Sequence, residues 1–331
     1  MAPVQSLRPS RPARPARPSW LSRLLRILLA MLSKLLAVFI PHASAVEVSF
    51  SRVSEGVYAH IGETGARSYD NQALNANIGL IVTPAGAVLI DSGATFQSAQ
   101  KIHAAVKKIT PQPVRWVINT GGQDHRWLGN GYFATQGAEL IAHAKARPDM
   151  QARGGDHLAA LTAVLKERAK VTVPMLPTRL IDGDDASLEL GGMTLALRHR
   201  GGGHTPGDMM VWLPAQKVLL SGDIVYVELM LSVIPESNTR AWLAAFEVIE
   251  ALSPQHIVPG HGKLSTLALA RADTADYQGA LRANMKKSAD EGLDVSAAVR
   301  SFDAAPYNRL LNAAELMPGN ASRTYLELER E

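Results

Sequence analysis

The sequence predicts an α/β sandwich, in which two packed mixed β-sheets are flanked by helices. From Val46 onwards, β-rich and helical stretches alternate in the order β, α, β, α. Two sheets that each bury one face, with helices on their outer faces, fit this order. In addition, 47% of the residues are hydrophobic and 19% are charged, a balance typical of a globular chain with a large core.

The first 45 residues have the features of a signal or targeting segment. Arginines lie in a Pro-rich stretch, followed by an apolar run over 24–40 that Arg26 and Lys34 interrupt. This run is shorter than the roughly 20 apolar residues that span a bilayer, and it is followed by the small residues 43–45, a cleavage pattern. We therefore expect an exported, periplasmic protein whose mature chain begins near Val46. An uncleaved anchor, or a start codon ahead of a shorter signal, would also give this pattern.

The net charge of +4 belongs to that leader. It holds seven of the 34 basic residues and no acidic one, so 27 basic and 30 acidic residues remain, a net charge of −3. Nothing therefore predicts a nucleic-acid surface. The chain has no cysteine, which excludes disulfides and thiolate metal ligands. The predicted partner is a small-molecule substrate, with membrane contact only through the N-terminal segment and the oligomeric state open.

In the first half, short apolar runs between turn residues predict strands over 48–53, 57–61, 77–82 and 87–90. Apolar residues at helical spacing then predict an amphipathic helix from Thr95 to Ile109. Strands over 114–119 and 140–142 follow. The stretch 144–170 is predicted to be mostly helical, with an interruption at Gly154 and Gly155.

In the second half, apolar runs predict strands around residue 180 and over 188–190, 193–197, 209–213 and 218–220. A helix is expected from Asn238, its N-cap, to Leu252, ahead of Pro254. A short buried strand over 256–258 follows. The remainder, from about residue 266, is predicted to be largely helical. We therefore expect one domain over 46–331 with a helical C-terminal extension.

Three motifs combine glycine with a potential metal ligand at the end of an apolar run. They are 203–208 (Gly-His-Thr-Pro-Gly-Asp), 221–223 (Ser-Gly-Asp) and 259–262 (Pro-Gly-His-Gly). Glycines at strand ends let the backbone turn sharply, so that side chains from separate strands can converge. Imidazole and carboxylate groups are the ligands that zinc accepts when no thiolate is present. Together the motifs predict a metal site that includes His204, Asp223 and His261.

In this order the motifs resemble the metallo-β-lactamase-fold hydrolases over nearly all of residues 46–331. Residues 76–79 and 89–93 are similar to that family's opening strands and their Asp-containing turn, and 116–120 to the strand before its main metal loop. Within the superfamily, 240–243 and 320–329 are most similar to the quinoprotein relay system zinc metallohydrolases. The resemblance implies the αββα metallo-β-lactamase fold, zinc and hydrolysis.

The main metal loop departs from the family pattern Thr-His-x-His-x-Asp-His-x-x-Gly-Asn. Residues 120–130 read Thr-Gly-Gly-Gln-Asp-His-Arg-Trp-Leu-Gly-Asn. With the length preserved, Gly121 and Gln123 replace two histidines, His125 replaces the aspartate and Arg126 the last histidine. A register slipped by one residue instead keeps Asp124 and His125 as the Asp-His pair.

Both registers leave only His204 in the first metal subsite. The second subsite keeps His125, Asp223 and His261, with Asp124 added in the slipped register. The resemblance therefore implies one zinc ion or none.

A zinc-bound water would be acidified towards a pKa of about 7 and would attack an ester, thioester, amide or lactam carbonyl. Asp124 is the candidate base or water-orienting group, unless it faces solvent and only caps the next helical turn. Gln123 could bind a substrate carbonyl and Arg126 a substrate carboxylate, although Arg126 could equally be a surface cation. Tyr226 either lines the pocket or only packs. Asp91 is expected to orient ligands rather than to contact metal.

Three functions remain open from the sequence. The first is a mononuclear zinc hydrolase, which the joint presence of His204, Asp223 and His261 favours. The second is a metal-free or catalytically degenerate binding or accessory protein on the same fold, which Gly121 and Gln123 favour. The third is an iron-dependent redox protein, although iron usually needs more ligands than remain here. The substrate is not predicted beyond a carbonyl compound.

Overall fold

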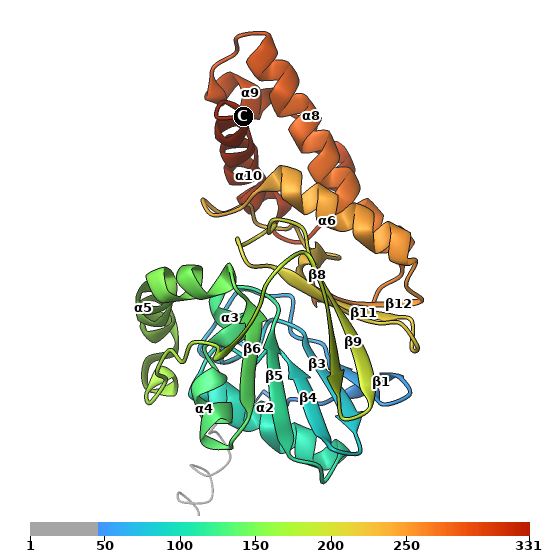
Figure 1. The fold of residues 1–331 in the computed structure, drawn as a ribbon. Helices are drawn as coiled ribbons and strands as arrows, with labels where there is room; N and C mark the ends of the chain where they lie inside the picture. The colour runs from blue at the N-terminus through green and yellow to red at the C-terminus, as the bar shows by residue number, and fades with distance from the viewer. Residues whose placement is uncertain (1–45) are drawn as a thin grey trace, which may run out of the picture. The chain divides into compact units, whose positions relative to one another are not determined.

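The computed structural model describes residues 46–331, so the predicted targeting segment lies outside the described residues. Two mixed sheets pack face to face (Figure 1). One sheet has seven strands in the order β1-β2-β3-β4-β5-β6-β7, and the other has five in the order β12-β11-β10-β9-β8. The predicted sandwich of two mixed sheets with flanking helices is confirmed.

The first sheet is antiparallel from β1 to β4 and parallel from β4 to β7. The second is antiparallel from β8 to β11, and β12 joins β11 in parallel. The strands of the first sheet are β1 (Ser51–Ser54), β2 (Val57–His60), β3 (Ile78–Thr83), β4 (Gly86–Ile90), β5 (Val114–Asn119), β6 (Glu139–His143) and β7 (Arg179–Ile181). Those of the second are β8 (Asp185–Leu190), β9 (Met193–His199), β10 (Met209–Leu213), β11 (Val218–Tyr226) and β12 (His256–His261).

The core between the sheets explains why the central strands are apolar on both faces. Ile81, Ile118 and Ile141 of the first sheet share one buried cluster with Leu197 and Val211 of the second. The opposite face of the first sheet buries Leu80, Leu89 and Val117 against the helix that follows β4. Strands covered on both faces lose the polar alternation of a solvated sheet.

Four helices accompany the first sheet, namely α2 (Phe96–Ile109), α3 (Asp124–Trp127), α4 (Asn130–Thr135) and α5 (Ala146–Leu165), followed by the turn η1 (Lys166–Ala169). Helix α2 begins after Thr95, whose side chain caps it in a capping box with Ser98. The predicted interruption at Gly154 is wrong, because α5 runs through it. A Cβ at Gly154 would lie 2.8 Å from the Trp127 ring, so the glycine allows close packing and does not break the helix.

The C-terminal helices gather beyond the second sheet, as Figure 1 shows. They are α6 (Thr239–Leu252), α7 (Leu267–Ala270), η2 (Arg271–Ala275), α8 (Asp276–Asp290), α9 (Val295–Ser301), η3 (Ala305–Tyr307) and α10 (Ala313–Leu328). Trp242, Tyr277 and Leu281 join this layer to Leu219 and Val225 of β11 in one buried cluster. Among residues 46–331, no helix is long and apolar enough to cross a membrane.

Candidate metal centre

Three predicted metal ligands converge from β11, from the end of β12 and from α3, the short helix after β5. Atoms of His125, Asp223 and His261 lie within 4.8 Å of one another, and all three residues are buried. The His125 Nε2 is 3.2 Å from Asp223 Oδ2, and the His261 Nε2 is 3.3 Å from Asp223 Oδ1. Two ligands that are each about 2.0–2.1 Å from a tetrahedral zinc lie roughly 3.3 Å apart. Each imidazole therefore lies at the distance from the Asp223 carboxylate that two ligands of one zinc ion have.

The orientation of His261 leaves one ring nitrogen directed at Asp223. Its Nδ1 lies 2.8 Å from the carbonyl oxygen of Asn75, which can only accept a hydrogen bond, so Nδ1 carries the proton. Burial lowers the pKa of His261 to about 4, so the ring is neutral at pH 7. Its Nε2 lies 3.3 Å from Asp223 Oδ1, which also accepts from Arg126 Nη2 at 2.5 Å. This nitrogen could therefore bind a metal ion or, when protonated, donate to Asp223.

His204 lines the same pocket but does not belong to the three-residue group. Its Nδ1 donates to the Ser232 carbonyl at 2.8 Å, which leaves Nε2 unprotonated in the neutral ring. Burial lowers the pKa of His204. The structure thus brings three of the four predicted ligands together and places His204 beside them as a neutral imidazole.

The pocket beside this group is a cavity of about 230 Å³. Tyr226 lines it, and its ring stacks on His261 with centroids 4.9 Å apart. Gln123 also lines the pocket, and its Oε1 accepts from Arg153 Nη1 at 3.4 Å. Apolar wall residues include Leu229, Met230 and Leu316.

Arg126 lies away from substrate, inside an ion-pair chain. Its Nε and Nη2 donate to the two oxygens of Asp223 at 3.1 and 2.5 Å, and its Nη1 donates to Asp91 at 3.0 Å. The residue is 1% exposed, so it is not a surface cation. Binding a substrate carboxylate does not fit this placement either, because every guanidinium nitrogen already donates to the protein.

This chain fixes the ionisation of Asp223. Burial raises the pKa of this carboxyl, but Arg126 and His125 outweigh burial and bring it well below its usual range. Asp91 contacts Thr120 and Arg126, with Thr120 N 2.7 Å from its Oδ1. Asp91 therefore acts on the metal ligands only through Arg126.

Asp124 does not join the ligand group, because its carboxylate is paired with Arg67 in two hydrogen bonds. Burial raises the pKa of Asp124, but Arg67 and His125 outweigh burial and hold it well below its usual range. Such an acidic carboxyl is a poor proton acceptor, which does not fit the role of base. Arg67 Nη2 also lies 2.8 Å from Nδ1 of His125.

The structure of the main loop fits the register that preserves the length of the family pattern. His125 and Arg126 both reach Asp223, whereas Asp124 does not. At Gly121, a Cβ would lie 2.4 Å from Oδ1 of Asp208. The volume next to Gly121, where the family pattern has its first histidine, is therefore occupied by a neighbouring carboxyl group.

The sequence motifs did not identify several residues of this region. Asn77 donates to the carbonyls of Pro259 and Gly262, both at 2.8 Å, and so fixes the turn that carries His261. Arg67 reaches Asp124 from a loop before β3. Neither residue lies in a glycine-and-ligand motif, so no local signal marked them.

The two mixed sheets with outer helices and the buried His-Asp-His group define an αββα protein with a possible metal site. The family model described as "Metallo-beta-lactamase superfamily" matches residues 72–261, more than half of the chain. The chain therefore belongs to the metallo-beta-lactamase superfamily.

Relatives and solved structures agree with this assignment. The chain is 24% identical over 226 residues to "Metallo-beta-lactamase type 2" of Bacillus cereus, covering 67% of this chain and 79% of the relative. It is 26% identical over 209 residues to "Metallo-beta-lactamase IND-1" of Chryseobacterium indologenes, covering 62% and 77%. A metallo-beta-lactamase structure from Pontibacter korlensis superposes with a TM-score of 0.54 and 21% identity, over 68% of this chain and 95% of that one.

Proposed function

We propose that this protein is an exported, mononuclear zinc hydrolase of a carbonyl compound. The observation that carries the proposal is the convergence of three buried side chains, in which His261 Nε2 lies 3.3 Å from one oxygen of Asp223 and His125 Nε2 lies 3.2 Å from the other. Membership of the metallo-beta-lactamase superfamily supports hydrolysis. Export rests on residues 1–45, and N-terminal sequencing of the secreted chain should begin near Val46.

Each residue of the site has its own role in this proposal. His125, Asp223 and His261 would hold one zinc ion, which would supply a Lewis acid and an acidified water. Burial and the Asp223 carboxylate raise the pKa of Tyr226 well above its usual range, so its hydroxyl keeps its proton beside Asp223. Gln123 lines the pocket and can bind the substrate carbonyl.

Asp124 takes a positioning role in this proposal. Its Oδ1 lies 3.2 Å from Nδ1 of His125, near enough to accept a hydrogen bond from a protonated Nδ1 when Nε2 serves as the ligand. Arg126 holds Asp223 from behind and keeps it ionised.

The substrate class is an ester, thioester or lactam. The apolar wall formed by Leu229, Met230 and Leu316 favours a hydrocarbon group next to the reacting carbonyl. The names of the relatives point to β-lactams, but fold does not fix substrate, so a panel of all three classes is needed.

Metal analysis and activity together test the proposal. Protein purified without chelator should contain about one zinc per chain, and His261→Ala should abolish both zinc and hydrolysis. His256→Ala is a matched control, because His256 begins the same strand and lies outside the ligand group. A zinc content below roughly 0.2 per chain would contradict the proposal.

A metal-free binding protein is the second candidate. It is favoured by the two arginines that already neutralise the carboxylates here, Arg67 on Asp124 and Arg126 on Asp223. Hydrolysis that zinc restores after chelation, and that His261→Ala abolishes, would exclude it.

A further inference from the structure

The C-terminal helix α10 lines two neighbouring cavities, although it lies beyond the residues 72–261 that the family model matches. Asn312 and Leu316, at its start, line the pocket of the metal centre. Further along, Arg323 and Leu326 line a larger groove of about 580 Å³. Ile234 lines both, so the pocket and the groove share a wall. The groove thus begins beside the loop whose Ser232 holds His204.

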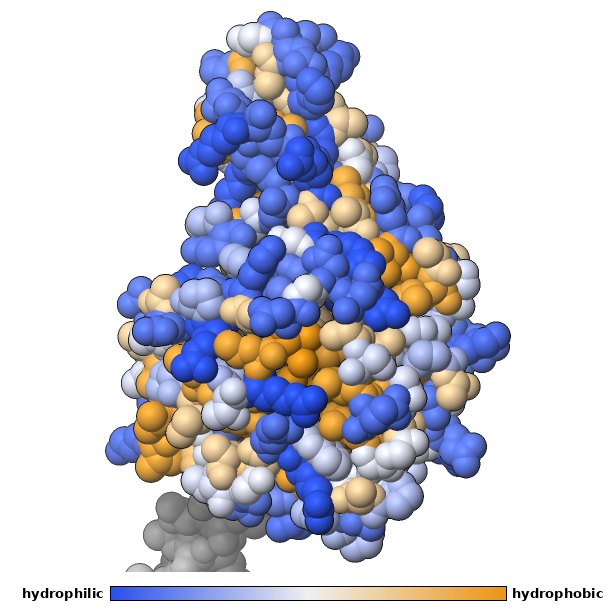
Figure 2. Space-filling model, viewed as in Figure 1, coloured by the Kyte–Doolittle hydropathy of each residue, from blue (hydrophilic) through white to orange (hydrophobic). Residues whose placement is uncertain are grey.

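The groove has an apolar part. Val233, Ile234, Pro235 and Leu326 line it, and its volume lies within the roughly 300–1,000 Å³ of small-molecule sites. Figure 2 shows that hydrophilic residues predominate over the C-terminal helical part in that view, as expected for a solvated layer. An apolar groove in such a layer fits a hydrocarbon segment.

The charged part of the groove has a positive surplus. Its carboxylates, Glu327 and Glu331, are both paired with Arg282, which does not line the groove. Glu327 also accepts from the backbone N–H and hydroxyl of Thr239. Arg282 supplies one positive charge to these two carboxylates, so the three arginines that line the groove keep its net charge positive.

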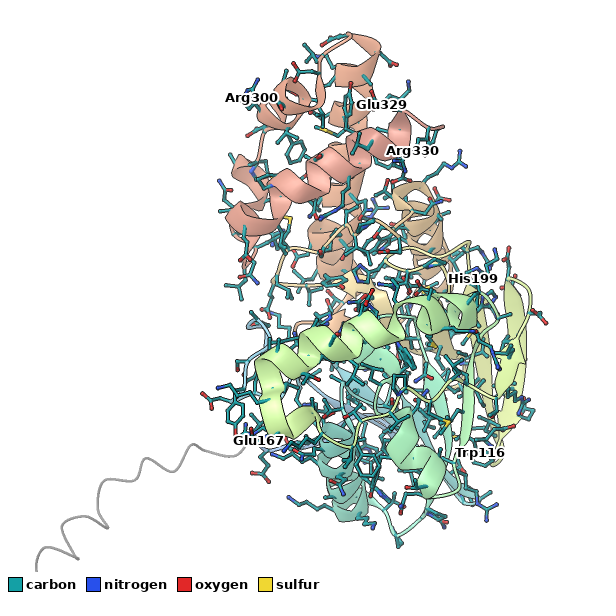
Figure 3. The ribbon with its side chains drawn as sticks, turned by 90° about the vertical axis from the view of Figure 1, so that its left-hand side faces the viewer. Trp116, Glu167, His199, Arg300, Glu329 and Arg330 are labelled. Carbon is teal, nitrogen blue, oxygen red and sulfur yellow. The ribbon has the colours of Figure 1, made fainter. Side chains whose placement is uncertain are left out.

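The arginines of the groove have no such partners. Over residues 46–331, Arg240, Arg323 and Arg330 take part in no ion pair. Arg323 is anchored by one hydrogen bond from Nη1 to the Val233 carbonyl at 2.7 Å. Arg330 follows α10 near the end of the chain, where Figure 3 labels it beside Glu329. Unpaired guanidinium groups at an apolar groove bind carboxylates and phosphates.

We propose that this groove binds the far end of the substrate, and that the substrate is an amphipathic anion: a hydrocarbon chain that carries a carboxylate or phosphate away from the reacting carbonyl. The placement of the carbonyl at the metal centre rests on the proposed function, whereas anion binding in the groove does not. Leu316 and Arg323 are two helical turns apart on α10, roughly 10 Å along its axis. The charge therefore sits well beyond the carbonyl.

Binding to chelated, metal-free protein tests the groove independently of catalysis. Calorimetric titration with decanoate, decyl phosphate and neutral 1-decanol compares equal chain lengths, and the first two distinguish carboxylate from phosphate. We expect at least one anion to bind roughly three- to tenfold more tightly than decanol, with the difference falling as salt is added.

Arg240→Gln combined with Arg330→Gln should remove most of that preference and leave decanol binding unchanged. Arg323 is spared because it anchors Val233. Arg115→Gln is the matched control, since Arg115 is an exposed residue of β5 outside the groove. Equal thermal midpoints would show that the variants fold.

Equal binding of both anions and decanol, or wild-type anion preference in the double variant, would overturn the proposal. If the anions bind as expected but the zinc-loaded protein hydrolyses no ester, thioester or lactam, the proposed function fails and the groove stands. If decyl esters are hydrolysed equally with and without a distal anion, and the anions show no preference, the groove fails and the proposed function stands.

Discussion

The two halves of the metal centre differ in what surrounds the expected ligand positions. In the second subsite, His125, Asp223 and His261 converge within 4.8 Å. In the first, His204 lines the pocket alone, and Gly121 lies against Asp208. Both halves are buried, so exposure does not distinguish them.

Where this chain lacks a ligand of the family pattern, neighbouring side chains fill the space. Asp208 and Thr205 pack next to Gly121, and the Thr205 hydroxyl accepts from Gly122 N at 3.0 Å. A close-packed interior fills such space with neighbouring side chains. In the second subsite, in contrast, hydrogen bonds from Arg126 hold the Asp223 carboxylate facing the two imidazoles.

The largest expected effect comes from Arg126→Met, which tests what holds the second subsite together. This change leaves Asp91 and Asp223 buried without their shared cation, so we expect the free energy of unfolding to fall by about 3–5 kcal/mol. Denaturant unfolding measures it. Exposed Arg115→Met should stay within about 0.5 kcal/mol of wild type. A cost below about 1 kcal/mol for Arg126→Met would show that the ion-pair chain does not organise the site.

The next effect concerns the first subsite and its pH dependence. Burial raises the pKa of Asp208 to about 7 from an ordinary value of 3.8. The folded state therefore binds this proton more tightly than the unfolded state does. The resulting stability is fully present below about pH 4 and is lost as pH rises through about 7.

Asp208→Asn should remove this component. Its side-chain amide can still accept from Thr205 N, which lies 2.9 Å from Asp208 Oδ2. Between pH 4 and 8, wild type should lose on the order of 2–4 kcal/mol more stability than the variant, as measured by denaturant unfolding at each pH. Asp290→Asn, at an exposed helix end, serves as control. Parallel pH profiles for wild type and Asp208→Asn would contradict the expectation.

A third and smaller effect tests whether the first subsite can be restored. Gly121→His returns the histidine of the family pattern, but its Cβ would meet Asp208 Oδ1 at 2.4 Å. We expect the free energy of unfolding to fall by about 1–3 kcal/mol and the zinc content to stay at about one per chain. Gly65→Ala is the control, because nothing lies within 4 Å of a Cβ there. A second bound zinc in Gly121→His would contradict this expectation and would mean that Asp208 moves to make room for the histidine.

The difference between local and long-range contacts explains which features could be predicted from the sequence. Apolar spacing predicted α2 and α6 almost to the residue, since each has one buried face and a side-chain N-cap, Thr95 and Asn238. It failed at Gly154, because a glycine placed for contact with Trp127 has the same local pattern as one that ends a helix.

For the site, local motifs predicted residues that strand ends bring together. They could not predict partners far apart in the chain. Arg67 is 57 residues from Asp124, and the burial of Arg126 depends on carboxylates 35 and 97 residues away. The contacts of Arg67 and Asp91 form once the first sheet assembles, and that of Asp223 forms once the two sheets pack, so no spacing rule in the sequence indicates them.

A last substitution, Arg67→Met, sharpens the comparison most directly, because Arg67 contacts His125, a candidate ligand of the second subsite. A guanidinium only donates, so His125 Nδ1 accepts from Arg67 at 2.8 Å and Nε2 carries the proton. Ligation through Nε2 requires the other tautomer, in which Nδ1–H faces Asp124 Oδ1 at 3.2 Å. Arg67 thus favours the form of His125 that does not bind metal.

Replacing Arg67 by Met should therefore raise zinc affinity by roughly tenfold, as measured by competition with a chromophoric chelator. The free energy of unfolding should fall by about 1–3 kcal/mol, since the Asp124 carboxylate stays buried without its cation but still accepts from His125 N. Arg67→Lys separates charge from geometry, because an ammonium keeps the positive charge but lacks the planar fork. Unchanged zinc affinity in Arg67→Met would mean that the tautomer of His125 does not limit binding, and that the second subsite is ready for its ion without any rearrangement.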